Sequence, residues 1–235
     1  MRKINVLLIA SGNGTGAEKI MEASRAGQLP GVNIAGLIST KEGAPCLQRA
    51  KKLGFRVLCL DYEFLGPEEF GSRLFSFCNK ENIEIIFLTG CVVKIPLMEG
   101  LVIYNIHPAD IELAGGKGMY GLQPHIRVLE NIKDLINRGR ARIVDDFYTF
   151  PTVHEVSEAY DQGPVLLKAS VQIPSEIVVR YMAGGADAIK LAVKLQSHVM
   201  PYEWLMLPLA VNLAAQRLLD SPEADFYRKF ISRIK

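Results

Sequence analysis

The part of the sequence best suited to chemistry is Asn105-Ile106-His107-Pro108, which ends a short apolar run beginning near Val102. In an extended chain, residues two apart point to the same side, so Asn105 and His107 would present an amide and an imidazole to one face. The amide can donate a hydrogen bond to an oxygen that becomes negative, and histidine can carry a proton near neutral pH. This pair is therefore suited to acyl transfer.

A carboxylate follows at Asp161-Gln162-Gly163-Pro164, after an apolar segment that contains His154. A carboxylate beside His107 would orient the imidazole and stabilise its charged form. An aspartate before glycine and proline is also ordinary turn chemistry. The predicted catalytic set of Asn105, His107 and Asp161 thus depends on a fold that brings all three together.

A glycine-rich loop, Ser11-Gly12-Asn13-Gly14-Thr15, joins the apolar run Ile4–Ala10 to a segment of helical period. Backbone N–H groups and the helix dipole would point at a bound anion there, which predicts a phosphate site made by Ser11, Gly12, Asn13, Gly14 and Thr15. A turn that only packs the strand on the helix is the structural alternative.

The spacing Gly12-x-Gly14-x-x-Ala17 also fits a loose dinucleotide fingerprint, so an NADP-dependent oxidoreductase is the alternative from another enzyme class. The fingerprint calls for an acidic residue about 20 positions further on, to hold the ribose. The chain has Ser39-Thr40-Lys41 at that place. The missing acid weakens the dinucleotide hypothesis. It does not remove it, because these three residues could bind NADP in place of NAD.

The elements that must position these residues alternate between short Val- and Ile-rich runs and segments of helical period, as βα units do. This pattern predicts an α/β fold with an open, mostly parallel twisted sheet and helices on both faces, whose ligands gather at the carboxyl ends of the strands. The expected strands are Ile4–Ala10, Val32–Ser39, Arg56–Leu60, Ile83–Leu88 and Val102–Ile106, and the expected helices are Thr15–Ala26, Pro45–Leu53 and Pro67–Asn79.

In the second half, the glycine-rich loop Ala114–Gly121 precedes a helix that begins near Pro124. Two extended segments follow, and further helices are expected from Ser175 and from Trp204. No repeat or linker divides the chain, so we expect one domain over 1–235, with a phosphate-binding half at about 1–100, a half with the catalytic residues and a second ligand at about 101–200, and C-terminal helices at about 201–235. The two extended segments are Phe147–Val156 and Val165–Ile173.

Composition excludes several classes of protein. The chain has 235 residues, of which 49% are hydrophobic, with 27 basic and 25 acidic side chains and a formal net charge of +2. It can bury a large core and carries no basic footprint for nucleic acid. The widely spaced cysteines Cys46, Cys59, Cys78 and Cys91 suit neither metal binding nor disulfide scaffolds. We therefore expect a cytoplasmic protein with neither nucleic-acid nor membrane partners, and the sequence leaves homo-oligomer formation open.

The motifs, taken together and in order, resemble those of the glycinamide ribonucleotide formyltransferases and related folate-dependent formyltransferases. The likeness extends from Ile4 to about Ile173. It rests on Ala10-Ser11-Gly12-Asn13-Gly14-Thr15, Leu88-Thr89-Gly90, Asn105-Ile106-His107-Pro108, Gly115-Gly116-Lys117-Gly118-Met119-Tyr120-Gly121-Leu122 with His125, Thr152-Val153-His154 and Asp161-x-Gly163-Pro164.

The resemblance implies transfer of a formyl group from 10-formyltetrahydrofolate to the amine of glycinamide ribonucleotide in purine biosynthesis, without a metal. Asn105 would bind the formyl oxygen, His107 would move protons, and Asp161 would complete the relay through a water. An amino sugar nucleotide is an alternative acceptor. The residues expected to bind the folate are Leu88, Gly90, Val92, Val93, Thr152 and His154.

Two departures from the family pattern leave the true acceptor open. Gly16 stands where relatives usually carry asparagine, beside the expected phosphate. Near the C-terminus, where relatives show a glutamate directly before a histidine, the chain reads Gln196-Ser197-His198. If Ser197 takes the place of that acid, the ribose of the ribonucleotide is expected to bind more weakly.

Overall fold

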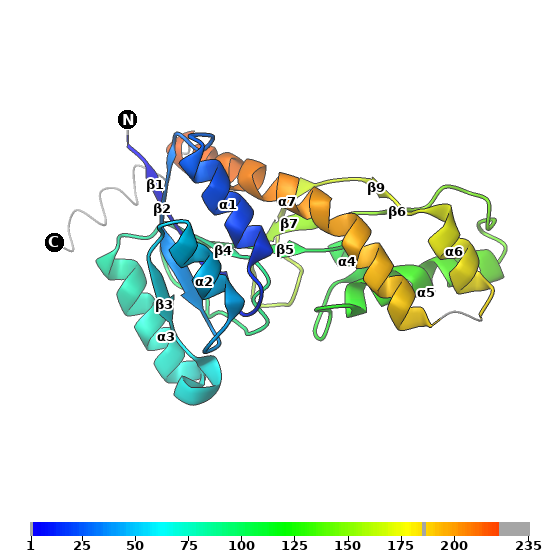
Figure 1. The fold of residues 1–235 in the computed structure, drawn as a ribbon, viewed down its shortest axis with the longest axis horizontal. Coiled ribbons are helices and arrows are strands. Elements are labelled where there is room, and N and C mark those ends of the chain that lie inside the picture. Colours follow the sequence, from blue (N-terminus) through cyan, green and yellow to red (C-terminus); the bar gives the residue numbers. More distant parts are fainter. Residues whose placement is uncertain (1, 185–186, 221–235) are drawn as a thin grey trace. The chain divides into compact units, whose positions relative to one another are not determined.

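The computed structural model describes residues 2–184 and 187–220. Strands and helices alternate through the first half, and short strands and longer helices make up the second (Figure 1). The strands are β1 (Ile4–Ala10), β2 (Val32–Ser39), β3 (Val57–Cys59), β4 (Ile85–Leu88), β5 (Val102–His107), β6 (Tyr148–Thr149), β7 (Thr152–Glu155), β8 (Val165–Lys168) and β9 (Val171–Gln172). The helices are α1 (Thr15–Arg25), α2 (Pro45–Lys52), α3 (Tyr62–Lys80), α4 (Ile111–Ala114), α5 (Gln123–Asn137), α6 (Ser175–Met182) and α7 (Ala188–Asp220).

The main sheet has seven strands in the order β3-β2-β1-β4-β5-β7-β8, and β6 pairs with β9 in a separate two-stranded sheet. The pairs from β3 to β5 are parallel, whereas β7 and β8 are antiparallel. The predicted α/β fold with a mostly parallel sheet is confirmed. Because its parallel strands are buried on both faces, β1 and β4 read as continuous apolar runs instead of alternating ones.

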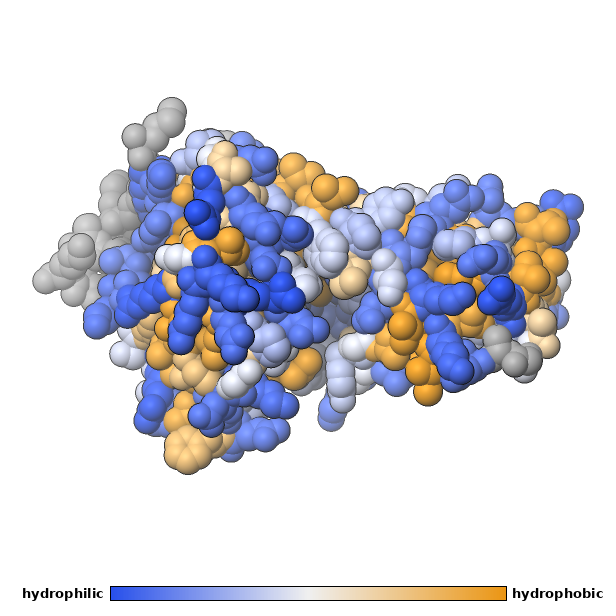
Figure 2. All heavy atoms as spheres, viewed as in Figure 1, coloured by the Kyte–Doolittle hydropathy of each residue, from blue (hydrophilic) through white to orange (hydrophobic). Residues whose placement is uncertain are grey.

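The described residues divide into two compact units, 2–105 with 207–220, and 106–206. In the first unit, α1 and α2 pack on β2, and hydrophilic residues predominate on their outer faces (Figure 2). The inner face of α1 buries Ile20 and Met21 completely. Each such side chain contributes on the order of 1.5–3 kcal/mol through removal from water. This core holds the strand ends from which the glycine-rich loop emerges.

The second unit has its own hydrophobic cluster, formed by α5, α6, the first half of α7 and the segment around β9. Leu129, Leu191 and Leu195 are almost fully buried in it. Such a cluster gives the loops after β5 and β7 a rigid support. The expectation of one domain over 1–235 remains a prediction.

Helices α3, α4 and α7 are among the elements that differ from the sequence-based expectations, and the expected extended segments Phe147–Val156 and Val165–Ile173 are each divided into two strands. Helix α3 begins at Tyr62, one turn before Pro67, because Asp61 caps the first turn and Gly66 takes a positive φ of 72° at the kink between the two parts. The short helix α4 was not expected. Helix α7 begins at Ala188 and not at Trp204, and it continues through Pro201.

Two further points concern the end of the chain. The C-terminal helices expected over about 201–235 are one continuous helix as far as residue 220, and residues 221–235 lie outside the described part. Among the described residues, no helix combines the length and the apolar character needed to cross a membrane.

Candidate active site

Strand β5 carries the amide and the imidazole predicted to act together. Asn105 and His107 are the fourth and sixth of its six residues, and Asn105 pairs with Leu88 of β4. Residues two apart on a strand face the same way, so the strand itself sets their common orientation. Asn105 is partly exposed, whereas only 2% of His107 is exposed.

Both ring nitrogens of His107 face oxygen atoms. Nε2 lies 2.8 Å from the main-chain oxygen of Ala114, and Nδ1 lies 3.7 Å from Oδ2 of Asp161. A carbonyl oxygen only accepts hydrogen bonds, so Nε2 carries the proton of the neutral ring. The Nδ1 lone pair then faces the carboxylate, and protonation of Nδ1 would complete an ion pair with it. The structure thus brings the predicted residues His107 and Asp161 together.

The pKa of His107 lies below its ordinary value. Burial is the main cause, because a charged imidazole is disfavoured away from water. The negative charge of Asp161 and the hydrogen bond to Ala114 oppose this effect without cancelling it. A neutral His107 at physiological pH can accept a proton and return it, as a proton shuttle must.

Asp161 is held by three contacts. Its Oδ2 accepts a hydrogen bond of 2.9 Å from the backbone N–H of Gly116, its Oδ1 lies 3.4 Å from Nε2 of His154, and its Oδ2 faces His107. Burial would raise the pKa of the carboxyl, but the hydrogen bonds from His154 and Gly116 and the charge of His107 lower it below its usual value. Asp161 is therefore an ionised partner for the imidazole.

Close packing leaves room only for glycine on both sides of Asp161. A β-carbon on Gly115 would come within 2.9 Å of the Asp161 β-carbon, and one on Gly163 would come within 1.7 Å of the Glu155 carbonyl oxygen. Asp161 itself has a positive φ of 54°, uncommon for a residue with a side chain. The Asp-x-Gly turn is thus wedged against the end of β7 and the loop after α4.

The loop that begins at Ala114 covers this pair. Ala114 provides the carbonyl on His107 and Gly116 provides the N–H on Asp161, and both groups come from the predicted glycine-rich loop. Gly116, Gly118 and Gly121 all have positive φ values, which other residues rarely adopt. The main chain of this loop thus contacts both members of the pair.

In the first unit, the loop Ser11–Thr15 has the geometry expected before a helix. Helix α1 begins at Thr15 with Gly14 as its N-cap at φ 66°. A β-carbon on Gly14 would lie only 2.3 Å from that of Cys46, so the close approach of α2 also requires glycine there. The N–H groups of the first helical turn have no partner within the helix and can bind an anion.

Ser11, whose phosphate-binding role stays a prediction, makes several contacts within the protein. Its backbone N–H donates to Gly90, its hydroxyl is 2.6 Å from that of Thr40, and the same hydroxyl accepts from the N–H of Val92. These contacts tie the loop to the end of β4. The predicted folate residues Gly90 and Val92 therefore lie beside the glycine-rich loop, while 62% of Val92 is exposed.

Of the other predicted folate residues, Leu88, Thr152 and His154 are buried and Val93 is partly exposed. Leu88 is 6% exposed on β4, and Val93 follows Val92 on the same loop. Thr152 and His154 alternate on β7, and both are almost wholly buried. The Thr152 hydroxyl donates to the carbonyl of Phe150, which is a local structural contact.

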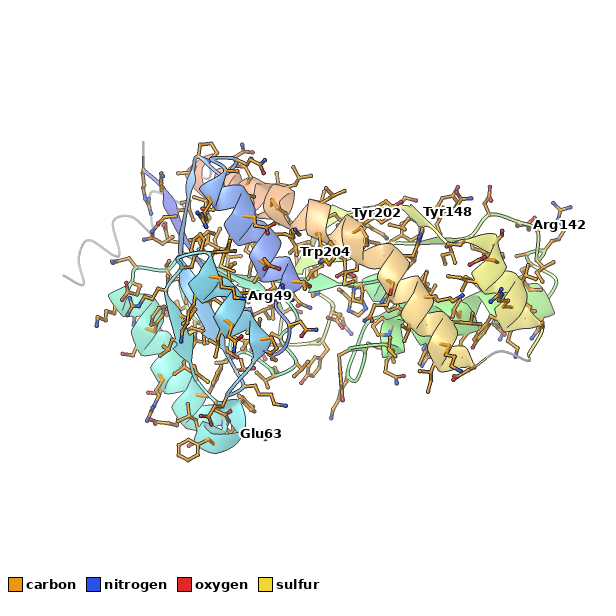
Figure 3. All side chains as sticks on the ribbon, viewed as in Figure 1. Arg49, Glu63, Arg142, Tyr148, Tyr202 and Trp204 are labelled. Atoms are coloured by element: carbon orange, nitrogen blue, oxygen red, sulfur yellow. The ribbon has the colours of Figure 1, made fainter. Side chains whose placement is uncertain are left out.

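Sequence analysis missed one acidic residue on α7, Glu203. Burial raises the pKa of its carboxyl to about 7. It occupies the position in the buried stripe of the helix between Val199 and Leu207, where an apolar residue is expected. It lies between Tyr202 and Trp204, which Figure 3 labels on α7. The signal that could have identified it is a carboxylate, itself partly exposed, at the helical spacing of the buried residues Val199 and Leu207.

By contrast, Ser197 shows no sign of a binding role. Its hydroxyl donates to the carbonyl of Val193 one turn earlier in the same helix, and the residue is exposed. Serine commonly makes this bond within helices. The acid sought at Ser197 therefore has a structural candidate at Glu203.

This chain is similar to known proteins in both sequence and fold. No protein-family model matches the chain. It is 29% identical over 192 residues to the chloroplastic phosphoribosylglycinamide formyltransferase of Arabidopsis thaliana, covering 77% of this chain and 61% of that protein. It is 29% identical over 178 residues to the chloroplastic enzyme of the same name from Vigna unguiculata, covering 74% of this chain and 53% of that protein. The chain thus spans little more than half the length of these relatives.

A solved structure agrees. Glycinamide ribonucleotide transformylase 1 of Symbiobacterium toebii superposes with a TM-score of 0.68 at 21% identity, over 91% of this chain and 88% of that chain. The resemblance predicted from the motifs is confirmed, since curated relatives and solved neighbours of this chain are phosphoribosylglycinamide formyltransferases and the chain has their fold.

Proposed function

We propose that this chain transfers a formyl group from 10-formyltetrahydrofolate to the primary amine of glycinamide ribonucleotide, a step of purine biosynthesis. The observation that carries the proposal is the approach of Asp161 Oδ2 to within 3.7 Å of His107 Nδ1, with Asn105 two residues before that histidine on β5. An amide, an imidazole and a carboxylate are the groups that acyl transfer to an amine requires. The likeness to named formyltransferases gives the substrates.

In this mechanism the amine nitrogen attacks the formyl carbon, and its carbonyl oxygen becomes negative. Asn105 donates a hydrogen bond to that oxygen, a contribution that is typically worth on the order of 10²–10³ in rate. The bond from the formyl carbon to the folate nitrogen then breaks. The proton lost by the amine passes through His107 to the departing nitrogen, and ionised Asp161 stabilises the charged imidazole meanwhile.

The phosphate of the ribonucleotide would bind at the loop Gly12–Thr15, where the N-terminus of α1 provides N–H groups and a positive dipole end. The folate would bind near Leu88, Gly90, Val92 and Val93. The folate is a co-substrate, and the proposal needs no metal. The cytoplasmic location remains a prediction.

The proposal is tested with purified protein, glycinamide ribonucleotide and 10-formyltetrahydrofolate, with the released tetrahydrofolate followed by absorbance and the formylated nucleotide by mass spectrometry. Equal amounts of both products are expected. An amino sugar nucleotide offered as the acceptor should give no product. Formylation of the amino sugar nucleotide and not of the ribonucleotide would change the proposed acceptor and leave the proposed formyl transfer intact. Folate binding without transfer to either acceptor would refute the proposed function.

A further inference from the structure

A second buried imidazole lies on the opposite side of Asp161 from His107. His154 is on β7, only 2% of it is exposed, and its Nε2 is 3.4 Å from Oδ1 of Asp161. Its other nitrogen, Nδ1, is 3.0 Å from the main-chain oxygen of Glu155. Both oxygens accept hydrogen bonds, so the ring can donate to both at once only as an imidazolium, which would also be an ion pair with Asp161. The folate-binding role expected of His154 from the resemblance stays a prediction, and these contacts indicate a role toward Asp161.

We propose that His154 is a positioning residue, which holds Oδ1 of Asp161 so that Oδ2 faces His107. The proposal rests on the proposed function in one respect only, namely that His107 and Asp161 form the reaction centre. His154 does not touch the reacting atoms in this scheme. It acts through the carboxylate.

The first support is that the two carboxylate oxygens of Asp161 have different partners. Oδ1 is next to His154, whereas Oδ2 is next to His107 and the N–H of Gly116. A carboxylate that could rotate freely would exchange its two oxygens. Contacts on both oxygens at once remove this freedom, and a group that orients an imidazole must be held in this way.

The second support is the backbone at Asp161. Its positive φ of 54° costs free energy for a residue with a side chain, and such a conformation persists only where the surroundings require it. Gly163, two residues later, packs directly on the carbonyl of Glu155, the residue after His154. The end of β7 thus fixes the turn that carries Asp161 through the main chain, and fixes its carboxylate through His154.

The third support is electrostatic. The hydrogen bond from His154 is the largest of the effects that lower the pKa of Asp161, ahead of the Gly116 N–H and the charge of His107. His154 and Asp110 also act on the pKa of His107 directly, but less than burial and Asp161 do: the charge of His154 lowers it and the charge of Asp110 raises it. Removal of His154 should therefore change Asp161 first, and His107 through it.

A nuclear magnetic resonance titration tests this directly. The carboxyl carbon of Asp161 is followed against pH in the wild-type protein and in the His154→Gln, His154→Leu and Val153→Ala variants. Because leucine cannot donate, the Asp161 midpoint should rise in His154→Leu. The Gln amide can donate in place of Nε2, so His154→Gln should keep most of the wild-type value.

Val153 is the matched control because it is fully buried beside His154 on β7 but points to the other side. Val153→Ala should lower the melting temperature and leave the midpoint in place. A midpoint that is equally unchanged in His154→Leu overturns the inference. If that variant does not fold, the test is made on the wild-type protein. The Nε2 resonance of His154 should then shift over the same pH range in which Asp161 titrates. A resonance that does not shift with Asp161 overturns the inference as well.

Kinetics separate the positioning role from folate binding. A positioning residue should lose kcat by about 10- to 100-fold in His154→Leu, with an unchanged KM for the folate and recovery in His154→Gln. A raised folate KM with wild-type kcat would assign His154 to the folate instead and overturn the inference. If the wild-type protein shows no turnover, the proposed function fails, and the titration alone decides whether His154 positions Asp161.

Discussion

Leu207 occupies the space that a side chain on Gly16 would need. A β-carbon on Gly16 would lie 2.7 Å from Cδ1 of Leu207 and 3.7 Å from the β-carbon of Thr89. Gly16 is the second residue of α1, directly after the proposed phosphate loop. The glycine that departs from the family pattern is thus matched by a leucine on α7. The departure is a packing exchange within the first unit.

We predict that Gly16→Ala destabilises the protein. The added methyl group forces Leu207 to move, and overpacking of this kind typically costs about 1–3 kcal/mol. Leu207→Ala in the same chain should recover much of the loss from the alanine at position 16, which a double-mutant cycle in urea measures as coupling between the two sites. Gly12→Ala, where a β-carbon meets nothing within 4 Å, is the stability control. Additive free energies of unfolding would refute the exchange.

Asn105→Ala should lower kcat by on the order of 10²–10³ without loss of structure, because the developing oxyanion loses its donor. Steady-state kinetics with the ribonucleotide and the folate measure this effect. Asn105→Asp, which has a similar shape but cannot donate when ionised, should be as slow as the alanine variant. An alanine variant with full activity would exclude Asn105 from the centre.

His107→Gln should remove the proton shuttle and lower kcat by about 10²–10⁴. Glutamine can still donate to the carbonyl of Ala114, so the loop contact should survive. The pH dependence of kcat is the measurement: the limb that reports the imidazole should disappear in the variant. If the same limb persists, another group moves the proton.

His125 should make the protein less stable in acid. It is fully buried on α5, and neither of its ring nitrogens has a hydrogen-bond partner among the described residues. Burial, with a smaller effect of His107, lowers its pKa from 6.5 to about 4. Below pH 6.5 the imidazole therefore takes up a proton in the unfolded chain, whereas in the folded chain it does so only below about pH 4. The free energy of unfolding consequently decreases as the pH falls through this window, by about 3 kcal/mol in total.

Urea unfolding at several pH values between 4 and 7 checks this prediction. His125→Phe should flatten the slope in that window, since phenylalanine has a similar shape and does not titrate. Wild-type and variant curves with the same slope would show that the acid sensitivity arises elsewhere.

Glu203 should have the opposite effect. Burial raises the pKa of its carboxyl from 4.5 to about 7, so the folded chain holds a proton that the unfolded chain releases above pH 4.5. Stability is then lost as pH rises from about 4.5 to 7, by up to about 3 kcal/mol. Glu203→Gln should be more stable than the wild type at pH 8 and equally stable at pH 4, as measured by urea unfolding. A variant that gains nothing at pH 8 would show that the carboxylate is well solvated.

The sequence by itself determined the strands and helices of the first half and their order. Apolar runs such as Ile4–Ala10 and Val32–Ser39 matched their strands residue for residue, because a buried parallel strand leaves a local signal. Glycine and proline marked the start of α2 and the loop before α1. The boundary of α7 was missed because Pro201 lies inside that helix, where local propensity argues against it.

The tertiary structure alone decided which predicted residues meet. Asp161 is far from His107 in the sequence, and only the packing of Gly163 on β7 and of Gly115 on the Asp161 turn brings its carboxylate to the imidazole. The same packing placed His154 on Asp161 and left Glu203 within a buried stripe. The periodicity of a sequence shows which face of a helix or strand is buried, but not which distant element packs against that face. The pKa of a buried side chain depends on the groups of that distant element, so the sequence alone does not predict it.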